Sequence, residues 1–141
     1  MKPKEILKQY GINATLQRII VLEYLHNTDS HPSVEKIYND LQEKYPSITL
    51  STIYNIVELF AKKGIIRKIY TPNGPARYDG RIDPHFHIYN EDTNEIYDIA
   101  DDELDRYLQN YIQNKLKDYP IHDYQLIFNI KPKEYTNSKN N

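Results

Sequence analysis

Residues 50–79 read LSTIYNIVELFAKKGIIRKIYTPNGPARYD, and this stretch decides the fold of the N-terminal half. Over residues 50–63 the apolar positions recur at helical spacing, and Gly64 stands just beyond the end of the predicted helix. A basic, β-branched segment follows at residues 65–70, and the turn sequence PNGP leads into a second short strand at 76–79. A helix followed by a short basic hairpin is typical of a winged helix-turn-helix, whose recognition helix enters the major groove of DNA.

Three further helices are predicted upstream of this stretch. Each has apolar side chains three or four residues apart, and most begin after a residue that can cap a helix N-terminus. The predicted ranges are 4–10, 16–27 with Thr15 as N-cap, and 34–45 with Ser33 as N-cap, while Thr49 is the N-cap candidate for 50–63.

The second half has a different pattern, in which strands flank one long helix. The predicted elements are strands at 85–89, 95–99 and 121–130 and a helix at 103–118 with Asp102 as N-cap. Such a thin layer leaves an edge and a face that self-association would cover. The fold class is therefore α+β, an N-terminal winged helix-turn-helix followed by a small α/β dimerisation domain. The expected division is a DNA-binding domain at 1–78, a hinge at 79–84, a dimerisation and metal-sensing domain at 85–133, and a disordered tail at 134–141.

Composition narrows the class of protein. The chain has 141 residues and no cysteine, which excludes a disulfide scaffold, a thiolate zinc site and a cysteine nucleophile. The longest aliphatic run, at residues 19–22, is far too short to span a membrane, and no signal sequence is evident, so we expect a cytoplasmic protein. Residues 1–78 carry 11 Lys and Arg against 7 acidic residues, and residues 79–141 carry 7 against 13. The basic half suits contact with a polyanion, and the acidic half suits metal binding.

Five side chains form a candidate metal site. His85 and His87 are two residues apart on a predicted strand, so their imidazoles face the same side, and Asp98 on the partner strand can lie opposite them. Imidazole nitrogen and carboxylate oxygen without thiolate suit Fe(II) or Mn(II) better than a structural tetrahedral zinc. On spacing alone, a pair of partly exposed histidines on a polar face is the alternative. The five candidate ligands are His31, Asp79, His85, His87 and Asp98.

Several spaced motifs agree in register with a known family. They are TLQR at 15–18, HP at 31–32, STIYN at 51–55, GII at 64–66, and the set Asp79, His85, His87 and Asp98. With this order of motifs, residues 5–131 resemble the ferric uptake regulator (Fur) family. The resemblance implies a homodimeric winged-helix repressor that binds a double-stranded DNA operator.

The same resemblance implies a regulatory metal. The five candidate ligands would hold one Fe(II) or Mn(II) ion per subunit, and Zn(II) would bind in vitro. Aspartate at positions 79 and 98 is similar to the peroxide-sensing, PerR-like branch, in which hydrogen peroxide oxidises an imidazole ligand of the iron form and DNA is released. The matching oxidation-sensitive candidates are His31 and His85. The alternative within the family is an iron-, manganese- or zinc-responsive repressor without peroxide sensing.

The DNA-contacting residues are likewise implied by the resemblance. They are Arg18, Ser51, Thr52, Tyr54, Asn55, Lys62, Lys63 and Arg67. Tyr54 could instead pack against a neighbouring helix, and Lys68 and Arg77 of the wing are further candidates for phosphate contacts. Ile56 stands where the family has Asn, and Glu58 stands where a basic residue is common, so we expect Glu58 to weaken DNA binding.

The chain also departs from the family. It lacks the paired CxxC motifs, so no structural cysteine-bound zinc is expected, and packing must hold the last strand. His26 and His122 are expected to be structural or surface histidines. Two rivals are a small metalloenzyme and a metal-independent winged-helix protein. Because no separate general base is identifiable and a basic winged helix would be unexplained, we expect a regulator and not an enzyme.

Overall fold

The computed structural model describes residues 1–83 and 85–139 of the chain. It divides into two compact units, an N-terminal unit (Met1–Ile82) and a C-terminal unit (Asp83–Asn141). This division falls inside the segment predicted as a hinge, of which Pro84 lies outside the described residues. Within those residues, no helix combines the length and the apolar composition that crossing a membrane requires.

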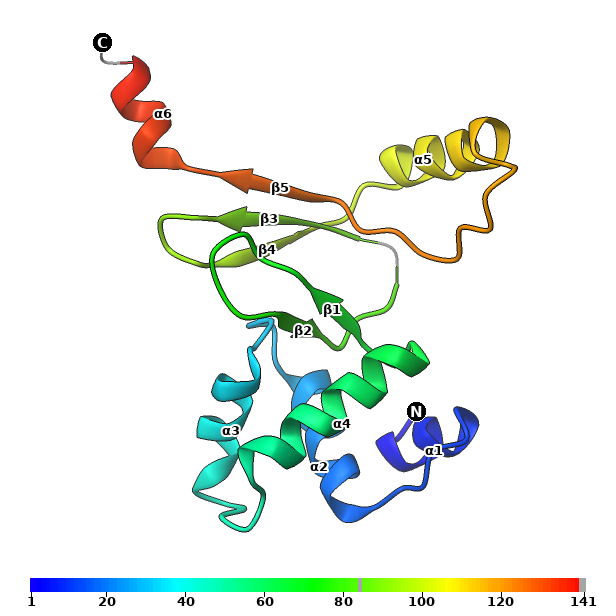
Figure 1. Cartoon of the computed structure of the whole chain (residues 1–141), viewed down its shortest axis with the longest axis vertical. Helices are drawn as coiled ribbons and strands as arrows, with labels where there is room; N and C mark the ends of the chain where they lie inside the picture. Colours follow the sequence, from blue (N-terminus) through cyan, green and yellow to red (C-terminus); the bar gives the residue numbers. More distant parts are fainter. Residues whose placement is uncertain (84, 140–141) are drawn as a thin grey trace. The chain divides into compact units, whose positions relative to one another are not determined.

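The N-terminal unit is a winged helix-turn-helix (Figure 1). Four helices precede a two-stranded antiparallel hairpin in which Lys68 lies opposite Tyr78. The elements are α1 (Pro3–Gln9), α2 (Leu16–Asn27), α3 (Val34–Gln42), α4 (Leu50–Lys63), β1 (Arg67–Ile69) and β2 (Arg77–Asp79). The recognition helix α4 has the bounds that the sequence predicts, whereas α3 ends three residues before the predicted position 45.

Local capping interactions explain where these helices begin. Thr15, Ser33 and Thr49 each accept a hydrogen bond from the backbone N–H three residues later, as predicted. Gly64 ends α4 in the left-handed region at φ 80°, where a residue without a Cβ is favoured.

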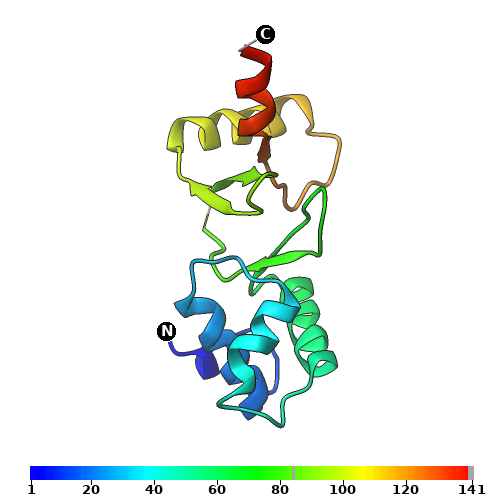
Figure 2. The same cartoon turned by 90° about the vertical axis from the view of Figure 1, so that its left-hand side faces the viewer.

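The helices of this unit lie close together (Figure 2), and their buried apolar side chains form one core. Side chains of α2 and α4, including Val21, Leu22, Val57 and Phe60, are fully buried in it. The ring of Tyr78 on β2 joins the same core, so the wing is packed onto the helices. Burial of these apolar side chains stabilises the N-terminal unit.

The C-terminal unit is a three-stranded sheet followed and flanked by helices. The elements are β3 (Phe86–Asn90), β4 (Ile96–Ile99), α5 (Asp102–Lys115), β5 (Ile127–Ile130) and α6 (Pro132–Lys139). The strand order is β4-β3-β5, with β3 and β4 antiparallel and β3 and β5 parallel. The predicted hairpin and final strand are present, although β5 is limited to the residues that pair with β3.

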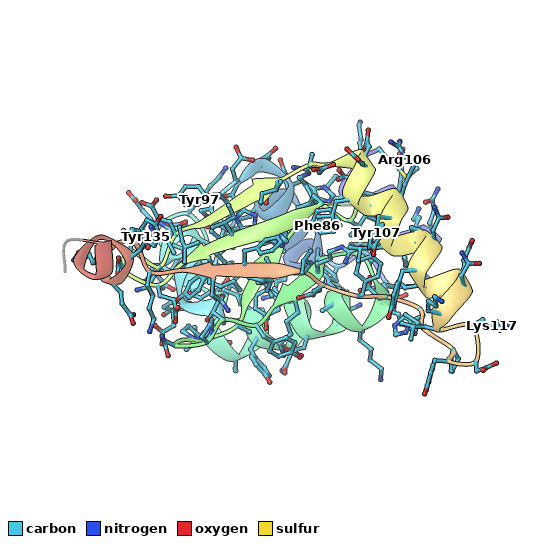
Figure 3. All side chains as sticks on the ribbon, turned by 90° about the horizontal axis from the view of Figure 1, so that it is seen from above. Phe86, Tyr97, Arg106, Tyr107, Lys117 and Tyr135 are labelled. Carbon is cyan, nitrogen blue, oxygen red and sulfur yellow. The ribbon has the colours of Figure 1, made fainter. Side chains whose placement is uncertain are left out.

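Helix α5 has no buried residue in the single chain. Tyr107 on this helix is 66% exposed, and Tyr97 on β4 is 46% exposed (Figure 3). Asp101 caps α5 by accepting a hydrogen bond from the Leu104 N–H, so the cap lies one residue before the predicted Asp102.

The C-terminal segment is helical where a disordered tail was predicted from residue 134. The Asp92 carboxylate, in the turn between β3 and β4, accepts a hydrogen bond from the Lys133 N–H at 2.9 Å. This contact satisfies one of the otherwise open donors at the start of α6. The polar composition of the segment gave no sign of a capping residue that lies 41 residues upstream.

Candidate metal centre and DNA-binding surface

The buried polar side chains are confined to one group of residues. Among the described residues, the buried polar or charged ones are His31, Asp79, His85 and His87. Burying such groups is unfavourable unless hydrogen bonds, ion pairs or a metal compensate for lost hydration. All four belong to the five predicted ligands, and the fifth, Asp98, has a side chain that is 27% exposed.

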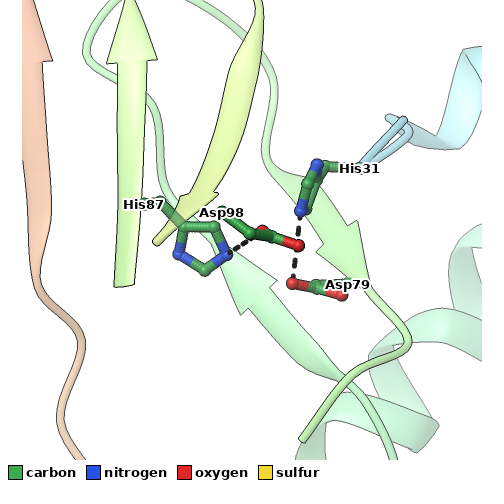
Figure 4. A group of neighbouring side chains, drawn as sticks. All are labelled: His31, Asp79, His87 and Asp98. Carbon is green, nitrogen blue, oxygen red and sulfur yellow. Dashed lines mark ion pairs between the residues drawn. The ribbon is translucent and has the colours of Figure 1, made fainter. Parts of the chain in front are cut away.

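In the N-terminal unit, His31 faces Asp79. The His31 Nε2 lies 3.3 Å from the Asp79 Oδ2 (Figure 4). The other carboxylate oxygen, Oδ1, accepts a hydrogen bond from the Arg81 N–H at 2.9 Å. Asp79 is therefore oriented by the backbone, and it presents its second oxygen to the imidazole.

The backbone at His31 is unusual. Its φ of 50° places it in the left-handed region, and it directly precedes Pro32. Non-glycine residues rarely adopt this region, and a following proline restricts the backbone further. The sequence indicated a stiff position here but not its conformation.

In the C-terminal unit, strand register brings together His87 and Asp98. They are direct partners across β3 and β4, and the His87 Nε2 lies 3.4 Å from the Asp98 Oδ1 (Figure 4). The His85 Nε2 lies 3.7 Å from the same oxygen, and the two imidazole rings are 4.6 Å apart between centroids. The prediction that both imidazoles face one side, with Asp98 opposite, is confirmed.

The ring of His85 is oriented by its other nitrogen. The His85 Nδ1 lies 2.7 Å from the Asp83 carbonyl oxygen. Because a carbonyl oxygen only accepts hydrogen bonds, Nδ1 must carry the proton, and Nε2 of the neutral ring keeps a lone pair for a metal. Such a backing carbonyl is typical of metal-ligating histidines.

The predicted DNA-binding residues lie mostly on one face of α4. Ser51, Tyr54, Asn55, Lys62 and Lys63 are exposed there, and about half of the Tyr54 side chain is open to solvent, at 52% exposure.

The other three predicted contacts have structural partners of their own. Thr52 is half-buried, and its hydroxyl accepts a hydrogen bond from the Thr49 hydroxyl at 2.8 Å. Arg18 and Arg67 are half-buried on α2 and β1, where they donate to the backbone carbonyls of Asn13 and Ile82.

Ile56 and Glu58, the two residues that depart from the family pattern on α4, are both engaged within the N-terminal unit. Ile56 is 7% exposed and belongs to the core, as its helical spacing alone would place it. The Glu58 carboxylate accepts hydrogen bonds from Lys68 Nζ at 2.8 Å and from the Tyr78 hydroxyl at 2.7 Å. The hydrogen bond from Lys68 holds the pKa of Glu58 below its ordinary value. Glu58 is therefore paired within the N-terminal unit, and its weakening of DNA binding stays a prediction.

The wing residue Arg77 also differs from its predicted role. It is half-buried, and its guanidinium donates hydrogen bonds to the backbone carbonyls of Ser30 and His31. Its guanidinium is directed toward the loop that carries the candidate ligand His31. The sequence did not predict this contact, because the two segments are far apart in the chain.

Comparison with known proteins places this arrangement in a family. The model of the ferric uptake regulator family matches residues 9–128, which is most of the chain. The protein belongs to the ferric uptake regulator family. This member contains no cysteine and therefore lacks the paired CxxC motifs.

Individual relatives of this Fur-family chain include a peroxide regulator. The peroxide operon regulator of Bacillus subtilis is 33% identical over 95 residues, which cover 67% of this chain and 66% of the relative. The matched segment thus spans slightly less than two thirds of that protein's length.

Solved structures of the family share the fold. The ferric uptake regulator from Pseudomonas aeruginosa with manganese has a TM-score of 0.79 at 22% identity, covering 93% of this chain and 98% of that one. The Campylobacter jejuni peroxide stress regulator has a TM-score of 0.71 at 24% identity, covering 93% and 96%.

The two histidines outside the candidate site are both exposed. Partial burial lowers the pKa of His26. His122 lies in the segment before β5. In the same segment, the Tyr124 hydroxyl donates a hydrogen bond to the Asp105 carboxylate of α5 at 3.0 Å. Both histidines were expected to be structural or surface residues, and the structure places both on the surface.

Proposed function

We propose that this protein is a homodimeric, metal-dependent transcriptional repressor that binds double-stranded DNA. One regulatory Fe(II) or Mn(II) ion per subunit would be held by His31, Asp79, His85, His87 and Asp98. The observation that carries this proposal is that the buried polar residues of the described chain are four of these five, each with a nitrogen or oxygen directed toward another member of its own unit.

The chemistry of the donors fits these ions. The N-terminal unit offers one imidazole and one carboxylate, and the C-terminal unit offers two imidazoles and one carboxylate. Neither set alone provides the five or six ligands that Fe(II) and Mn(II) favour, whereas both together do. Zn(II) accepts the same donors and is expected to bind in vitro.

A shared ion would link metal binding to DNA binding. The ligands His31 and Asp79 belong to the unit that carries α4, and the other three belong to the unit proposed to dimerise. Fixing one unit on the other would set the separation of two recognition helices, and operator half-sites require a defined spacing. Because the coupling is reciprocal, operator DNA would also tighten metal binding.

The C-terminal unit supports self-association. The apolar residues Tyr107, Tyr111, Phe128 and Ile130 are exposed in the single chain, and β5 is an edge strand of the sheet. Exposed apolar residues and an open edge are the features that a second copy would cover.

We further propose that hydrogen peroxide inactivates the repressor. Hydrogen peroxide would be the two-electron oxidant: one of its oxygen atoms would enter a ring C–H bond of His31 or His85, and the other would leave as water. A bound Fe(II) would catalyse this transfer. The names of relatives such as the peroxide operon regulator support this assignment. The resemblance of Asp79 and Asp98 to the peroxide-sensing branch supports it as well. An oxidised imidazole would no longer offer the same nitrogen, and DNA would be released.

The test is operator binding with each metal, before and after peroxide. DNA fragments selected from a random pool with Mn(II) present would serve as the operator, and fluorescence anisotropy would measure the dissociation constant. We expect tight binding with Mn(II) or Fe(II), weak binding with chelator, and loss after peroxide for the iron form only. Binding that is equally tight with chelator would contradict the metal-dependent repressor.

Mass spectrometry of the same samples distinguishes a peroxide sensor from a repressor that responds to metal alone. We expect peptides containing His31 or His85 to gain the mass of one oxygen atom in the iron form. Metal-dependent binding that survives peroxide, with unmodified histidines, would instead identify an iron-, manganese- or zinc-responsive repressor.

A further inference from the structure

We propose that Arg77 is a positioning residue for the metal ligand His31. Arg77 lies on β2, two residues before the other ligand of this unit, Asp79. Its Nε donates a hydrogen bond to the His31 carbonyl, and its Nη2 donates to the Ser30 carbonyl at 2.9 Å. The planar fork of a guanidinium fixes two successive carbonyls at once, which a lysine ammonium cannot reproduce.

A backbone hydrogen bond from β2 also holds the loop that carries His31. The Tyr78 N–H donates a hydrogen bond to the Pro32 carbonyl at 2.9 Å. Three successive carbonyls, those of Ser30, His31 and Pro32, are therefore bound by two successive residues of one strand. Of these contacts, only the two made by Arg77 depend on which side chain the sequence provides.

The loop needs such an attachment because its backbone is strained. His31 has a φ of 50° and precedes proline, a combination that persists only when the surroundings impose it. In this conformation its Nε2 lies 3.3 Å from the Asp79 Oδ2. Strand β2 thus supplies one ligand directly and orients the other through Arg77.

This role differs from a phosphate contact in what a substitution would change. An arginine that contacts DNA affects DNA affinity and its salt dependence, and leaves metal binding without DNA unchanged. An arginine that holds His31 affects metal affinity in the absence of any DNA. Removing partners that orient a metal ligand typically costs about 10- to 100-fold in metal affinity.

The inference rests on the proposed function, since it takes His31 as a ligand. The experiment measures the Mn(II) dissociation constant of the full-length protein without DNA, by competition with a chelating dye. The variants are Arg77→Lys, Arg77→Ala and His31→Ala, together with Arg77→Lys in the His31→Ala background. Arg106→Ala, at an exposed position on α5, controls for the loss of a positive charge.

We expect Arg77→Lys and Arg77→Ala to weaken Mn(II) binding by about 10-fold or more, and Arg106→Ala to leave it unchanged. In the His31→Ala background, Arg77→Lys should have no further effect, because the ligand it would orient is gone. Circular dichroism checks that each variant is folded, and the comparison in the His31→Ala background removes any general loss of stability.

The outcomes separate the two proposals. Normal Mn(II) affinity in His31→Ala would overturn the proposed metal site itself. Weak binding in His31→Ala but normal binding in Arg77→Lys would overturn the role of Arg77 alone. An equal loss from Arg77→Lys in both backgrounds would also overturn it, because the effect would then be independent of His31.

Discussion

The two units of the chain hold their candidate ligands by different means. In the N-terminal unit, a continuous apolar core supports β2, and hydrogen bonds from β2 hold the loop that carries His31. In the C-terminal unit, strand register places His87 opposite Asp98, but few apolar side chains are buried and none lie on α5. The ligand pair in the N-terminal unit is supported by the core of that unit alone, whereas we propose that a second copy of the chain supports the unit that carries the other three ligands.

The two units are expected to differ most in the unfolding free energy lost when a large apolar side chain is removed. Phe60→Ala removes a fully buried side chain from the N-terminal core, and we expect it to lower the free energy of unfolding by about 3–5 kcal/mol. Phe128→Ala, at a position 47% exposed in the C-terminal unit, should cost about 1 kcal/mol or less within the subunit. Chemical denaturation of both variants, at a chain concentration where size-exclusion chromatography shows single subunits, measures these losses, and equal losses would contradict the comparison.

A smaller loss of stability is expected at Gly80, which directly follows β2 within the N-terminal unit. A Cβ on Gly80 would lie 2.6 Å from the Leu25 carbonyl oxygen, so Gly80→Ala must displace backbone beside Asp79. We expect a loss of about 1–3 kcal/mol in unfolding free energy, together with weaker Mn(II) binding.

Gly74→Ala is the matched control for this substitution. Its Cβ would lie 3.5 Å from the Thr71 Oγ1, an ordinary contact in the turn of the wing. Little change is expected in stability or in Mn(II) affinity, measured by denaturation and by dye competition. If Gly80→Ala behaved like Gly74→Ala, the close packing of α2 against this segment would not position Asp79.

The smallest expected loss of stability comes from breaking the ion pair between Glu58 on α4 and Lys68 on the wing strand β1. Lys68 holds the pKa of Glu58 below its ordinary value of 4.5, so the ionised carboxylate stabilises the fold above that pH. This contribution is lost as the pH falls through the lowered pKa of the folded state. Because the pair is partly exposed, Glu58→Gln should cost about 1 kcal/mol or less at neutral pH.

Denaturation as a function of pH tests this prediction. The difference in unfolding free energy between wild type and Glu58→Gln should be constant near neutral pH and shrink below pH 4.5. Glu23→Gln, at an exposed position on α2, controls for removing a charge. A difference that grows on acidification would show that Glu58 is not stabilised by Lys68.

Local signals in the sequence predicted most helix ends and part of the candidate metal site. Capping residues such as Thr49, the glycine after α4 and the alternation of His85 and His87 act over a few residues, so they are readable without the fold. The helical spacing also placed Ile56 correctly in the core, where comparison with a family pattern suggested a position facing DNA.

Contacts between distant segments were not readable in this way. The partners of Glu58 come from both strands of the wing, and the partner of Arg77 is a loop 46 residues upstream. Asp92 likewise caps α6 from the turn between β3 and β4. Each of these polar side chains had several possible roles in the sequence, and only the tertiary fold selects one.

The central claim is that one ion is shared by ligands from both units. Titration of the full-length protein with Mn(II), followed by electron paramagnetic resonance, measures stoichiometry and affinity for wild type, His31→Ala and His87→Ala. The account predicts one strongly bound Mn(II) per chain in the wild type, and weaker binding at that same site after either substitution. Two independent ions per chain, or an affinity that depends on only one of the two histidines, would contradict it.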